Sequence, residues 1–199
     1  MPVEIKEFTP ARITNLNIKF KGEDLAEEFG CVGQIEGETE MLTVVKKCEG
    51  IEVRSKSSPQ KMTLKITGHV KVAPLRKIFG LSNEGLKAGV YSYGSDSKSK
   101  DFSLSADVID VFDETTKLIA FPNCTSSTGL TISIENGADE VAEMELEFTA
   151  MVDNYRKCYY EAMIEDIMNN LGDEADFFIE EWRKNFTSQL PKAVSTPTP

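Results

Sequence analysis

Histidine, the residue type that most often carries acid–base catalysis, gives this chain little support for an active site. His69 is the single histidine among 199 residues, and it follows Gly68 at the end of a predicted strand. A Ser-His-Asp or Cys-His arrangement would have to use it, and nothing around it resembles a nucleophile elbow. We therefore interpret His69 as a surface or strand-end residue and expect no enzymatic activity.

The cysteines are scattered along the chain, without a C-x-x-C pair that would suit zinc. One histidine cannot complete a histidine-rich metal site either. We expect no metal and no cofactor, and we expect these thiols to be buried in a reducing compartment. The four cysteines are Cys31, Cys48, Cys124 and Cys158.

Acidic residues and glycines offer weaker alternatives. An acidic stretch could be considered for calcium, but it lacks the glycine and the spacing of an EF-hand loop, so turn capping and solvation explain it better. Gly30, Gly33 and Gly37 are not followed by Lys-Ser/Thr, which argues against phosphate binding. Paired carboxylates of the glycosidase type are left open, because the chain has 33 acidic residues. The acidic stretch consists of Asp107, Asp110, Asp113 and Glu114.

The size and charge of the chain argue against several classes of protein. At 199 residues with 40% hydrophobic content, a single folded domain is the simplest interpretation. The net charge of −11 argues against a protein that binds nucleic acid or an anionic membrane, because phosphate binding depends on Lys and Arg. The charged N-terminus does not resemble a signal peptide, and no run approaches 18 apolar residues. We therefore expect synthesis and folding in a cytoplasm.

Alternation of apolar and polar residues predicts about eight strands, most of them adjacent in sequence. In the segment 13–20, for example, Leu16, Ile18 and Phe20 alternate with polar residues. This pattern indicates an antiparallel sandwich or barrel with attached helices, which is a β-rich α+β fold. The other strands that precede residue 130 are predicted at 41–48, 51–55, 60–70, 89–94, 102–111 and 117–121, with a loop or an irregular hairpin at 30–40 and a loop at 94–101.

Helical signals occur in the first half of the chain and again near the C-terminus. Pro74 and Gly80 bracket one short predicted helix. Apolar residues recur at helical spacing from Asp173 to Phe186, with acidic residues first and basic residues last, which complements the helix dipole. A further helix is expected at 155–171, ended by Gly172. We expect one domain over 1–190, comprising an N-terminal arm at 1–11 and a C-terminal amphipathic helix at 173–186, and then a disordered tail at 191–199.

The most informative pattern is a predicted β-hairpin from Leu130 to Val152. Its first strand alternates apolar and polar residues, and Asn136-Gly137 is a strong signal for a two-residue turn. The return strand has one apolar face and one acidic face. Three like charges on one strand face repel one another, so a solvated sheet face and a functional acidic surface are both open interpretations. The three charges are Glu143, Glu145 and Glu147.

Four segments of the C-terminal half carry a family resemblance. They are GLKAGVYSYGSDSKSKDFSLSADVIDVFDETTKLIAFPNC, GLTISIENGADEVAEMELEFTAMVD, Tyr159-Tyr160-Glu-Ala and Glu181-Trp-Arg-Lys-Asn-Phe-Thr. With these segments in order, the chain from about residue 85 onward resembles the major tail protein of long-tailed bacteriophages of Gram-positive hosts, the protein that forms the tail tube.

The resemblance implies a structural virion protein rather than an enzyme. It implies a β-sandwich with a flanking helix, subunits that form homo-oligomeric rings, commonly hexamers, and rings that stack around a tape-measure protein into a siphovirus tail for genome ejection. It also implies assembly with other tail proteins in the host bacterial cytoplasm and no membrane partner. In such a tube we predict that Glu143, Glu145 and Glu147 face the lumen, where carboxylates repel phosphates and DNA passes without specific binding.

Two alternatives come from other classes of protein. One is a tube component of a non-viral injection machine or another virion connector, which neighbouring genes would distinguish. The other is an acidic binding module or a small enzyme with an unrecognised cleft. A deep pocket with convergent polar groups would favour that one.

Overall fold

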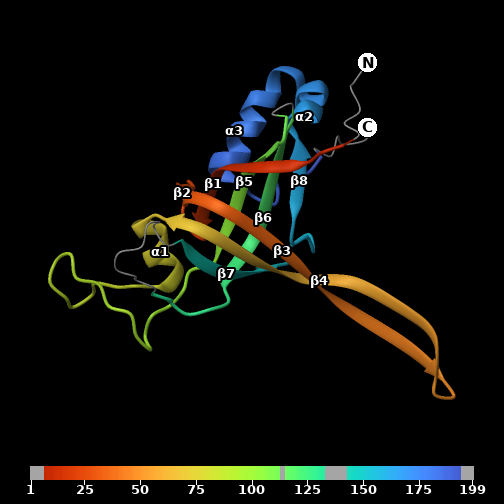
Figure 1. Cartoon of the computed structure of the whole chain (residues 1–199), viewed down its shortest axis with the longest axis horizontal. Coiled ribbons are helices and arrows are strands. Elements are labelled where there is room, and N and C mark those ends of the chain that lie inside the picture. Colours follow the sequence, from red (N-terminus) through yellow and green to blue (C-terminus); the bar gives the residue numbers. More distant parts are fainter. Residues whose placement is uncertain (1–6, 113–114, 133–142, 194–199) are drawn as a thin grey trace, which may run out of the picture.

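The computed structural model describes residues 7–112, 115–132 and 143–193. One antiparallel sheet dominates this part of the chain and curls around a hydrophobic core (Figure 1). The strand order is β2-β1-β5-β6-β7-β4-β3, and β8 pairs with β6. The strands are β1 (Pro10–Phe20), β2 (Glu27–Glu28), β3 (Gly30–Cys48), β4 (Ile51–Val70), β5 (Phe102–Asp110), β6 (Thr116–Ser126), β7 (Met144–Met151) and β8 (Tyr160–Met163). The helices are α1 (Val72–Phe79), α2 (Ile164–Leu171) and α3 (Ala175–Asn185), with a 3-10 turn, η1 (Gly172–Glu174), before α3.

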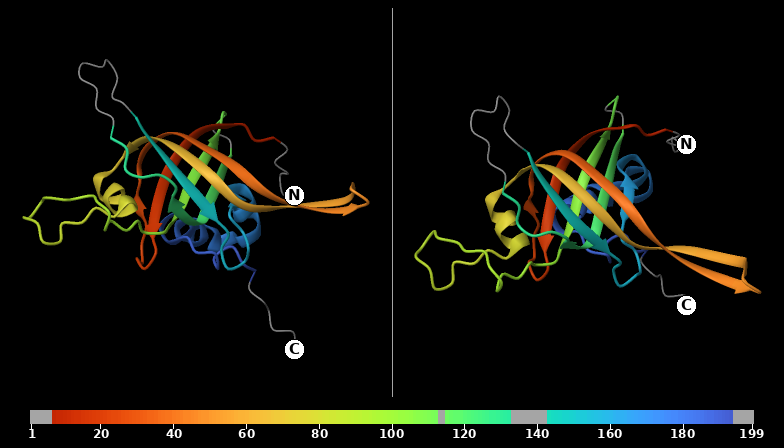
Figure 2. Two further views of the ribbon diagram at one scale, coloured as in Figure 1. Left: turned by 90° about the horizontal axis from the view of Figure 1, so that it is seen from below. Right: turned by 60° about the horizontal axis from the view of Figure 1, so that its bottom comes forward.

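The sheet closes on itself at Phe29, which separates β2 from β3. These two strands are almost continuous in sequence, yet they stand at opposite ends of the strand order. The Phe29 N–H donates to the carbonyl of Leu16 in β1 (2.9 Å), and the Phe29 carbonyl accepts from the N–H of Lys71, just after β4 (2.8 Å). One residue therefore joins the two edges, and the sheet becomes a barrel. Figure 2 shows the curled sheet in two further views.

The barrel interior holds the larger of two cores. Alternate side chains of each strand point inward, and Phe20 and Phe148 are fully buried there. Phe102 packs edge-to-face on Phe148, with ring centroids 5.0 Å apart. Helix α1 adds Ile78 and Phe79 to the same core, which explains why a short amphipathic helix follows β4 directly.

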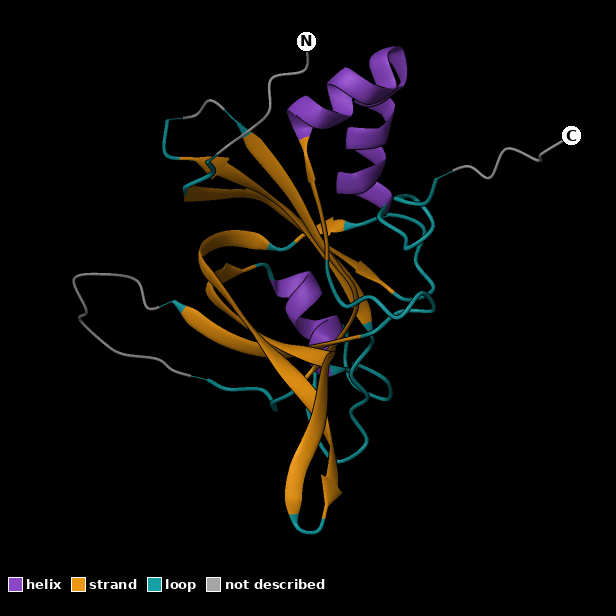
Figure 3. Cartoon of the chain, turned by 90° about the vertical axis from the view of Figure 1, so that its right-hand side faces the viewer, coloured by secondary structure: helices purple, strands orange, loops and turns teal. Residues whose placement is uncertain are grey.

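A second core lies between the outer side of the sheet and the pair α2–α3 (Figure 3). Leu118 and Ala120 of β6 are buried in it, together with Ile179 and Trp182 of α3. The Trp182 indole N–H donates to the carbonyl of Ile119 at 3.3 Å. Strand β6 is therefore covered on both faces, and the helices are held firmly on the sheet.

The β3–β4 hairpin continues far beyond the barrel as a two-stranded ribbon (Figure 1). Strand β7 pairs with β4 only up to Lys61, so residues 41–59 pair only with each other among the described residues. We call residues 41–59 the arm. Glu49 (φ +50°) and Gly50 (φ +80°) form the tight turn at its tip, as expected of a two-residue hairpin loop. Apart from the half-buried Val45, every arm residue is exposed.

The fold class predicted from the sequence, a β-rich α+β sandwich or barrel with a C-terminal amphipathic helix, is confirmed. The helix predicted between Pro74 and Gly80 corresponds to α1, which ends at Gly80 in the left-handed conformation (φ +68°). The helix predicted at 173–186 corresponds to most of η1 and all of α3. Residues 113 and 114, between the strands predicted at 102–111 and 117–121, lie outside the described residues, as do residues 1–6 and 194–199 of the two expected terminal segments.

Three predictions of local structure are wrong. The segment 30–40 is the first part of β3 rather than a loop or a hairpin of its own, because its backbone pairs along β4 while its polar side chains face solvent. The segment 155–171 is not one helix, since residues 160–163 pair with β6 as β8 before α2 begins. The segment 89–94 forms no strand and contributes only an isolated bridge between Ser92 and Ser82.

The pairing of the hairpin predicted from Leu130 to Val152 is also wrong. Its return strand exists as β7, but β7 pairs with β4 along eight residue pairs and with the end of β6 along three. Residues 130–132 form no strand, and Asn136-Gly137 lies outside the described residues. Pairing with β4 places the apolar face of β7 on the barrel core. A separate hairpin of residues 130–152 would not bury that face in the barrel.

Among the described residues, no helix combines the length and the apolar character that crossing a lipid bilayer requires.

Candidate assembly surfaces

Strand β7 presents a row of carboxylates on the outside of the barrel. Leu146 and Phe148 point into the core, whereas Glu145 and Glu147 point outward, as the alternation of the sequence predicts. Glu143 precedes β7 and is exposed; its carboxylate lies so close to Gly33 of β3 that a Cβ there would be 2.9 Å from either oxygen. The three glutamates predicted as a group therefore lie along one side of the molecule.

Neighbouring strands extend this row into an acidic face. Lys65 of β4 stands opposite Glu147 on one side and opposite Glu36 of β3 on the other. Lys61 lies 3.0 Å from Glu40 in an exposed ion pair. The acidic face comprises Glu36, Glu38, Glu40, Glu145 and Glu147, with Lys61 and Lys65 between the two rows.

The glutamates of β3 were missed because residues 30–40 were predicted to be a loop or an irregular hairpin rather than one strand. Glu36, Glu38 and Glu40 recur at every second position, which is the same strand signal that identified the row on β7. Five carboxylates outnumber two lysines on this face, so its net charge is negative.

The arm carries a different chemistry on the continuation of the same strand face. Pairing places Val44 beside Lys56 and Lys46 beside Arg54, and Leu42 lies on the same side of β3. This cationic face of the arm consists of Leu42, Val44, Lys46, Arg54 and Lys56. The hairpin is therefore acidic near the barrel and basic and aliphatic near its tip.

The opposite face of the arm is lined with hydroxyl groups. Thr43 pairs with Ser57, and their side-chain oxygens are 2.8 Å apart; Val45 pairs with Ser55. Along the arm, β3 and β4 pair only with each other, so their outer backbone edges are open within the described chain. Open edges of this kind are templates for pairing with another chain.

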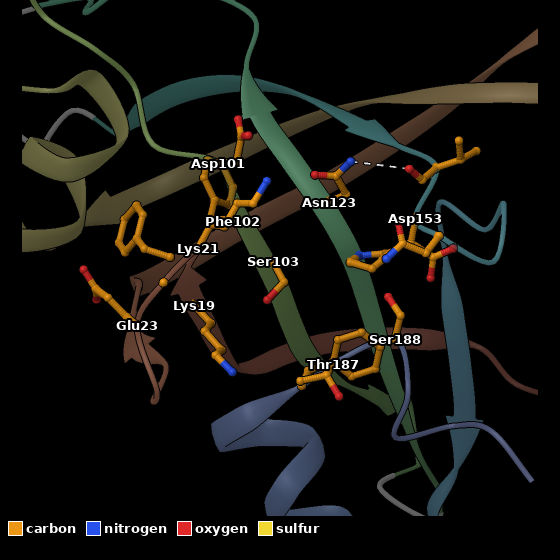
Figure 4. Close-up of a pocket in the computed structure, with 16 residues that line it drawn as sticks. Lys19, Lys21, Glu23, Asp101, Phe102, Ser103, Asn123, Asp153, Thr187 and Ser188 are labelled. Atoms are coloured by element: carbon orange, nitrogen blue, oxygen red, sulfur yellow. Dashed lines mark hydrogen bonds between the residues drawn. The ribbon is translucent and has the colours of Figure 1, made fainter.

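A pocket of about 410 Å³ lies at the ends of β1, β5 and β6, beside residues 186–188 (Figure 4). It contains lysines, carboxylates and hydroxyls, a mixture of groups that could in principle support acid–base chemistry. The Lys19 ammonium in this pocket donates a hydrogen bond to the side-chain oxygen of Asn185. His69 is not among the residues that line the pocket. His69 lies exposed at the penultimate position of β4, as predicted.

Asp153, which lines the same pocket, is engaged in holding a turn together. Its Oδ1 accepts the N–H groups of Tyr155 (2.8 Å) and Lys157 (2.9 Å), and its Oδ2 accepts the Tyr160 hydroxyl (2.6 Å). Partial burial by itself raises the pKa of Asp153, but these hydrogen bonds outweigh it and the pKa lies below its ordinary value. Asp153 is thus a structural carboxylate rather than a free general base.

The acidic stretch considered for calcium has two structural roles. Asp110 accepts the N–H groups of Thr9 (2.6 Å) and Phe112 (3.2 Å), and these bonds lower its pKa, the bond from Thr9 having the larger effect. This is turn capping, as predicted. Asp107 was expected to be solvated, and that is wrong: it is buried and ion-paired with Arg183 of α3. Asp113 and Glu114 lie outside the described residues.

The cysteines do not all follow the prediction that they are buried. Cys124 is buried in the barrel, and burial raises the pKa of its thiol. Cys31 and Cys48 are exposed on β3, and Cys158 is half-buried. In the described part of the chain, no three His, Cys, Asp or Glu residues are grouped so that they could hold a metal ion.

Comparisons with known proteins give structural likenesses but no match of sequence. No protein-family model matches the chain, and no curated protein matches it either. Among solved structures, the chain is similar to one described as the anti-feeding prophage cap, a tube terminating cap. The TM-score is 0.44 at 8% sequence identity, over 80% of this chain and 94% of that chain. A likeness of this size does not say which molecules this chain binds.

Proposed function

We propose that this chain is a structural subunit of a phage tail or a related injection machine, and that it self-assembles into stacked rings, in the simplest case hexamers, around a channel. The observation that carries the proposal is the arm. A two-stranded ribbon alone is marginally stable in water. Here it extends about 30 Å past Lys61, at roughly 3.3 Å per residue, and exposes Leu42, Val44 and Ile51. Contact with neighbouring subunits would bury these side chains and satisfy the open edges.

The segments that resemble the major tail protein support the same proposal from a separate direction. In that setting the partners are further copies of the chain, a tape-measure protein and other tail proteins, with the assembled virion as its location. The connections of the barrel leave one acidic face and one protruding arm, which suits a subunit that lines a channel and grips its neighbours.

Electron microscopy of the purified protein tests the proposal, with sedimentation velocity to count subunits. We expect rings or tubes with a central channel. A matched variant replaces residues 42–58 with a short Asn-Gly turn, and we expect it to fold but to remain monomeric. A wild-type chain that stays monomeric even with other tail proteins present would refute the proposal. Single rings that never elongate would indicate a connector or terminating piece instead.

We further propose that the acidic face lines the channel. The supporting observation is that β3 and β7 both direct glutamates to this side, around Lys61 and Lys65. Changing Glu145 and Glu147 to lysine should make assembled tubes retain DNA at low salt and release it as salt rises. The control changes Asp24 and Glu84, exposed residues elsewhere, to lysine. Equal retention of DNA by both variants, or a map with the acidic face on the outer wall, would refute this role.

The second alternative, an acidic binding module or small enzyme, has less support. In the described residues, the pocket of Figure 4 holds Lys19 and Asp153 in structural hydrogen bonds and places no histidine beside them. We therefore propose that the chain acts by assembly rather than by catalysis.

A further inference from the structure

An apolar groove runs along the α2–α3 pair on the side of the molecule away from the barrel core. Its volume is about 1020 Å³. The floor is formed by Ile167 and Trp182, which belong to the second core. Leu171 and Phe177 stand on its sides with 39% and 69% of their surface exposed. Large apolar side chains exposed together on paired helices are typical of a surface that meets another protein.

The sides of this groove are acidic. Asp166, Asp173 and Glu174 line it, and among the described residues none of the three has a lysine or arginine within 4 Å. The lysine of the lining, Lys192, lies over the ring of Tyr155 at 4.1 Å. The groove therefore combines an apolar floor with unneutralised negative charge, and it suits a partner that is aliphatic and basic.

The arm has this composition. Residues 41–59 include more basic side chains than acidic ones, although the whole chain has a net charge of −11. Three of the basic residues share one face with two aliphatic ones, Leu42 and Val44. The three are Lys46, Arg54 and Lys56.

A second groove offers a poorer match. It lies between β1 and β3, and its volume is about 500 Å³. Its lining is apolar, and among the described residues it includes Arg12 and Lys117 but no carboxylate that could pair with the cationic face of the arm. The acidic face attracts the arm by charge but offers no apolar floor for Leu42 and Val44.

We propose that the arm of one subunit docks in the α2–α3 groove of a second copy of this chain. The inference rests on the proposed function, because it names the contact by which the subunits assemble. Leu42 and Val44 cover the apolar floor, and the arm's basic residues meet Asp166, Asp173 and Glu174. The arm and the groove lie at opposite ends of the molecule (Figure 1), so the contact joins separate molecules.

Cross-linking tests the contact without any change to the arm, because the arm already carries an exposed cysteine. Cys48 is the last residue of β3, two positions beyond Lys46 of the cationic face. We would change Cys31 and Cys158 to serine and Asn170, which lines the groove, to cysteine, and then add a short bismaleimide. Cross-linked dimers and longer ladders are expected. Cys48→Ser in the same chain should abolish them, and Glu84→Cys in place of Asn170→Cys should give at least about tenfold less product.

Charge exchange provides the second measurement. Lys46→Glu, Arg54→Glu and Lys56→Glu together should raise the concentration needed for assembly more than about tenfold, and so should Asp166→Lys, Asp173→Lys and Glu174→Lys together. All six changes in one chain should restore assembly to within about threefold of wild type. Circular dichroism first establishes that each variant is folded. A six-change chain that assembles no better than the three-change chains would overturn the contact.

The outcomes separate this inference from the proposed function. Tubes in which Cys48 does not cross-link to the cysteine introduced by Asn170→Cys, or in which the arm is linked to another surface, would overturn the contact and leave the tube. Cross-linked dimers without rings would support the contact and refute the tube. Monomers without cross-links would refute both.

Discussion

Replacing Arg183 with alanine should lower the free energy of unfolding more than any other single change on the surface of α3. Arg183 Nη2 lies 2.7 Å from Asp107 Oδ2, and its Nε donates to Oδ1 at 3.2 Å. Asn15, held in the left-handed conformation at a bulge in β1 (φ +51°), donates a third bond to Oδ2 at 2.7 Å. The Asp107 side chain is 3% exposed, so water cannot take the place of the guanidinium.

The expected loss follows from the charge that the substitution leaves behind. Breaking a buried ion pair costs about 3–5 kcal/mol, because an uncompensated charge stays buried. The Arg183 side chain is 32% exposed, which lowers the expectation for Arg183→Ala. We expect a loss of about 2–4 kcal/mol, which at about 2 kcal/mol per molar moves the urea midpoint down by about 1–2 M. Asp107→Asn keeps the bond to Asn15, and the Arg183 charge that loses its partner is partly exposed to water, so this change should cost about 1–2 kcal/mol.

Urea unfolding of both single variants and the double variant measures the coupling. The double variant should lose at least about 1 kcal/mol less unfolding free energy than the two single variants together. The reason is that, once Asp107 is an amide, removing Arg183 no longer leaves a buried charge without a partner. Lys184→Ala is the matched control: its ion pair with Glu180 is exposed, so the change should stay within about 0.5 kcal/mol. Additive losses, or an Arg183→Ala variant as stable as Lys184→Ala, would show that this reasoning is wrong.

Three further predictions concern the core, the turn at Asp153 and the thiols. Phe148→Ala should lose about 3–5 kcal/mol in urea unfolding, because Phe148 is fully buried between aromatic rings; a loss below about 1 kcal/mol would contradict this packing. The folded-state pKa of Asp153 is lowered, so its contribution to stability is present above the unfolded pKa of about 4 and is lost as pH falls through the folded value. Asp153→Asn should therefore flatten the fall in melting temperature below about pH 4, and an unchanged profile would argue against the assignment. A thiol reagent at neutral pH should label Cys31 and Cys48 within minutes and Cys124 only after unfolding, because thiolate is the reactive form; mass spectrometry of the labelled peptides would reveal an early reaction of Cys124.

Local patterns were enough to predict most of the strands and helices. Strand alternation found Leu16, Ile18 and Phe20 because one face of β1 is buried and the other is not. Gly80 marked the end of α1 because a left-handed residue stops a helix wherever it lies in the fold. These signals depend on a residue and its near neighbours, so the sequence alone contains them.

Strand pairing could not be predicted in the same way. β7 pairs with β4, whose residues lie far earlier in the chain, and the Asn136-Gly137 signal pointed to a nearer partner. Residues 30–40 have few apolar side chains, so the alternation of their glutamates is a weak strand signal, and their pairing with β4 is what establishes the strand. The edge of β6 likewise turned residues 160–163 into β8 within a segment whose spacing suggested a helix.

The candidate surfaces were predictable in part. The outward orientation of Glu145 and Glu147 followed from alternation, but the joining of their row to Glu36, Glu38 and Glu40 required the strand order. The arm's cationic face depends on a change of register between Glu40 and Met41, which no local pattern reports. Asp107 was misjudged because its partner, Arg183, comes from a helix 76 residues away.

The unbroken passage of β3 and β4 from the barrel into the arm has a mechanical consequence. A pull on the arm tip runs along the axis of β4, which is held against β7 by eight consecutive residue pairs. Such a load shears all of these pairs at once instead of opening them one after another. Tension on a docked arm would thus be carried by the barrel wall, and the resistance of an assembly to stretching would depend on the β4–β7 pairing as much as on the contact at the tip.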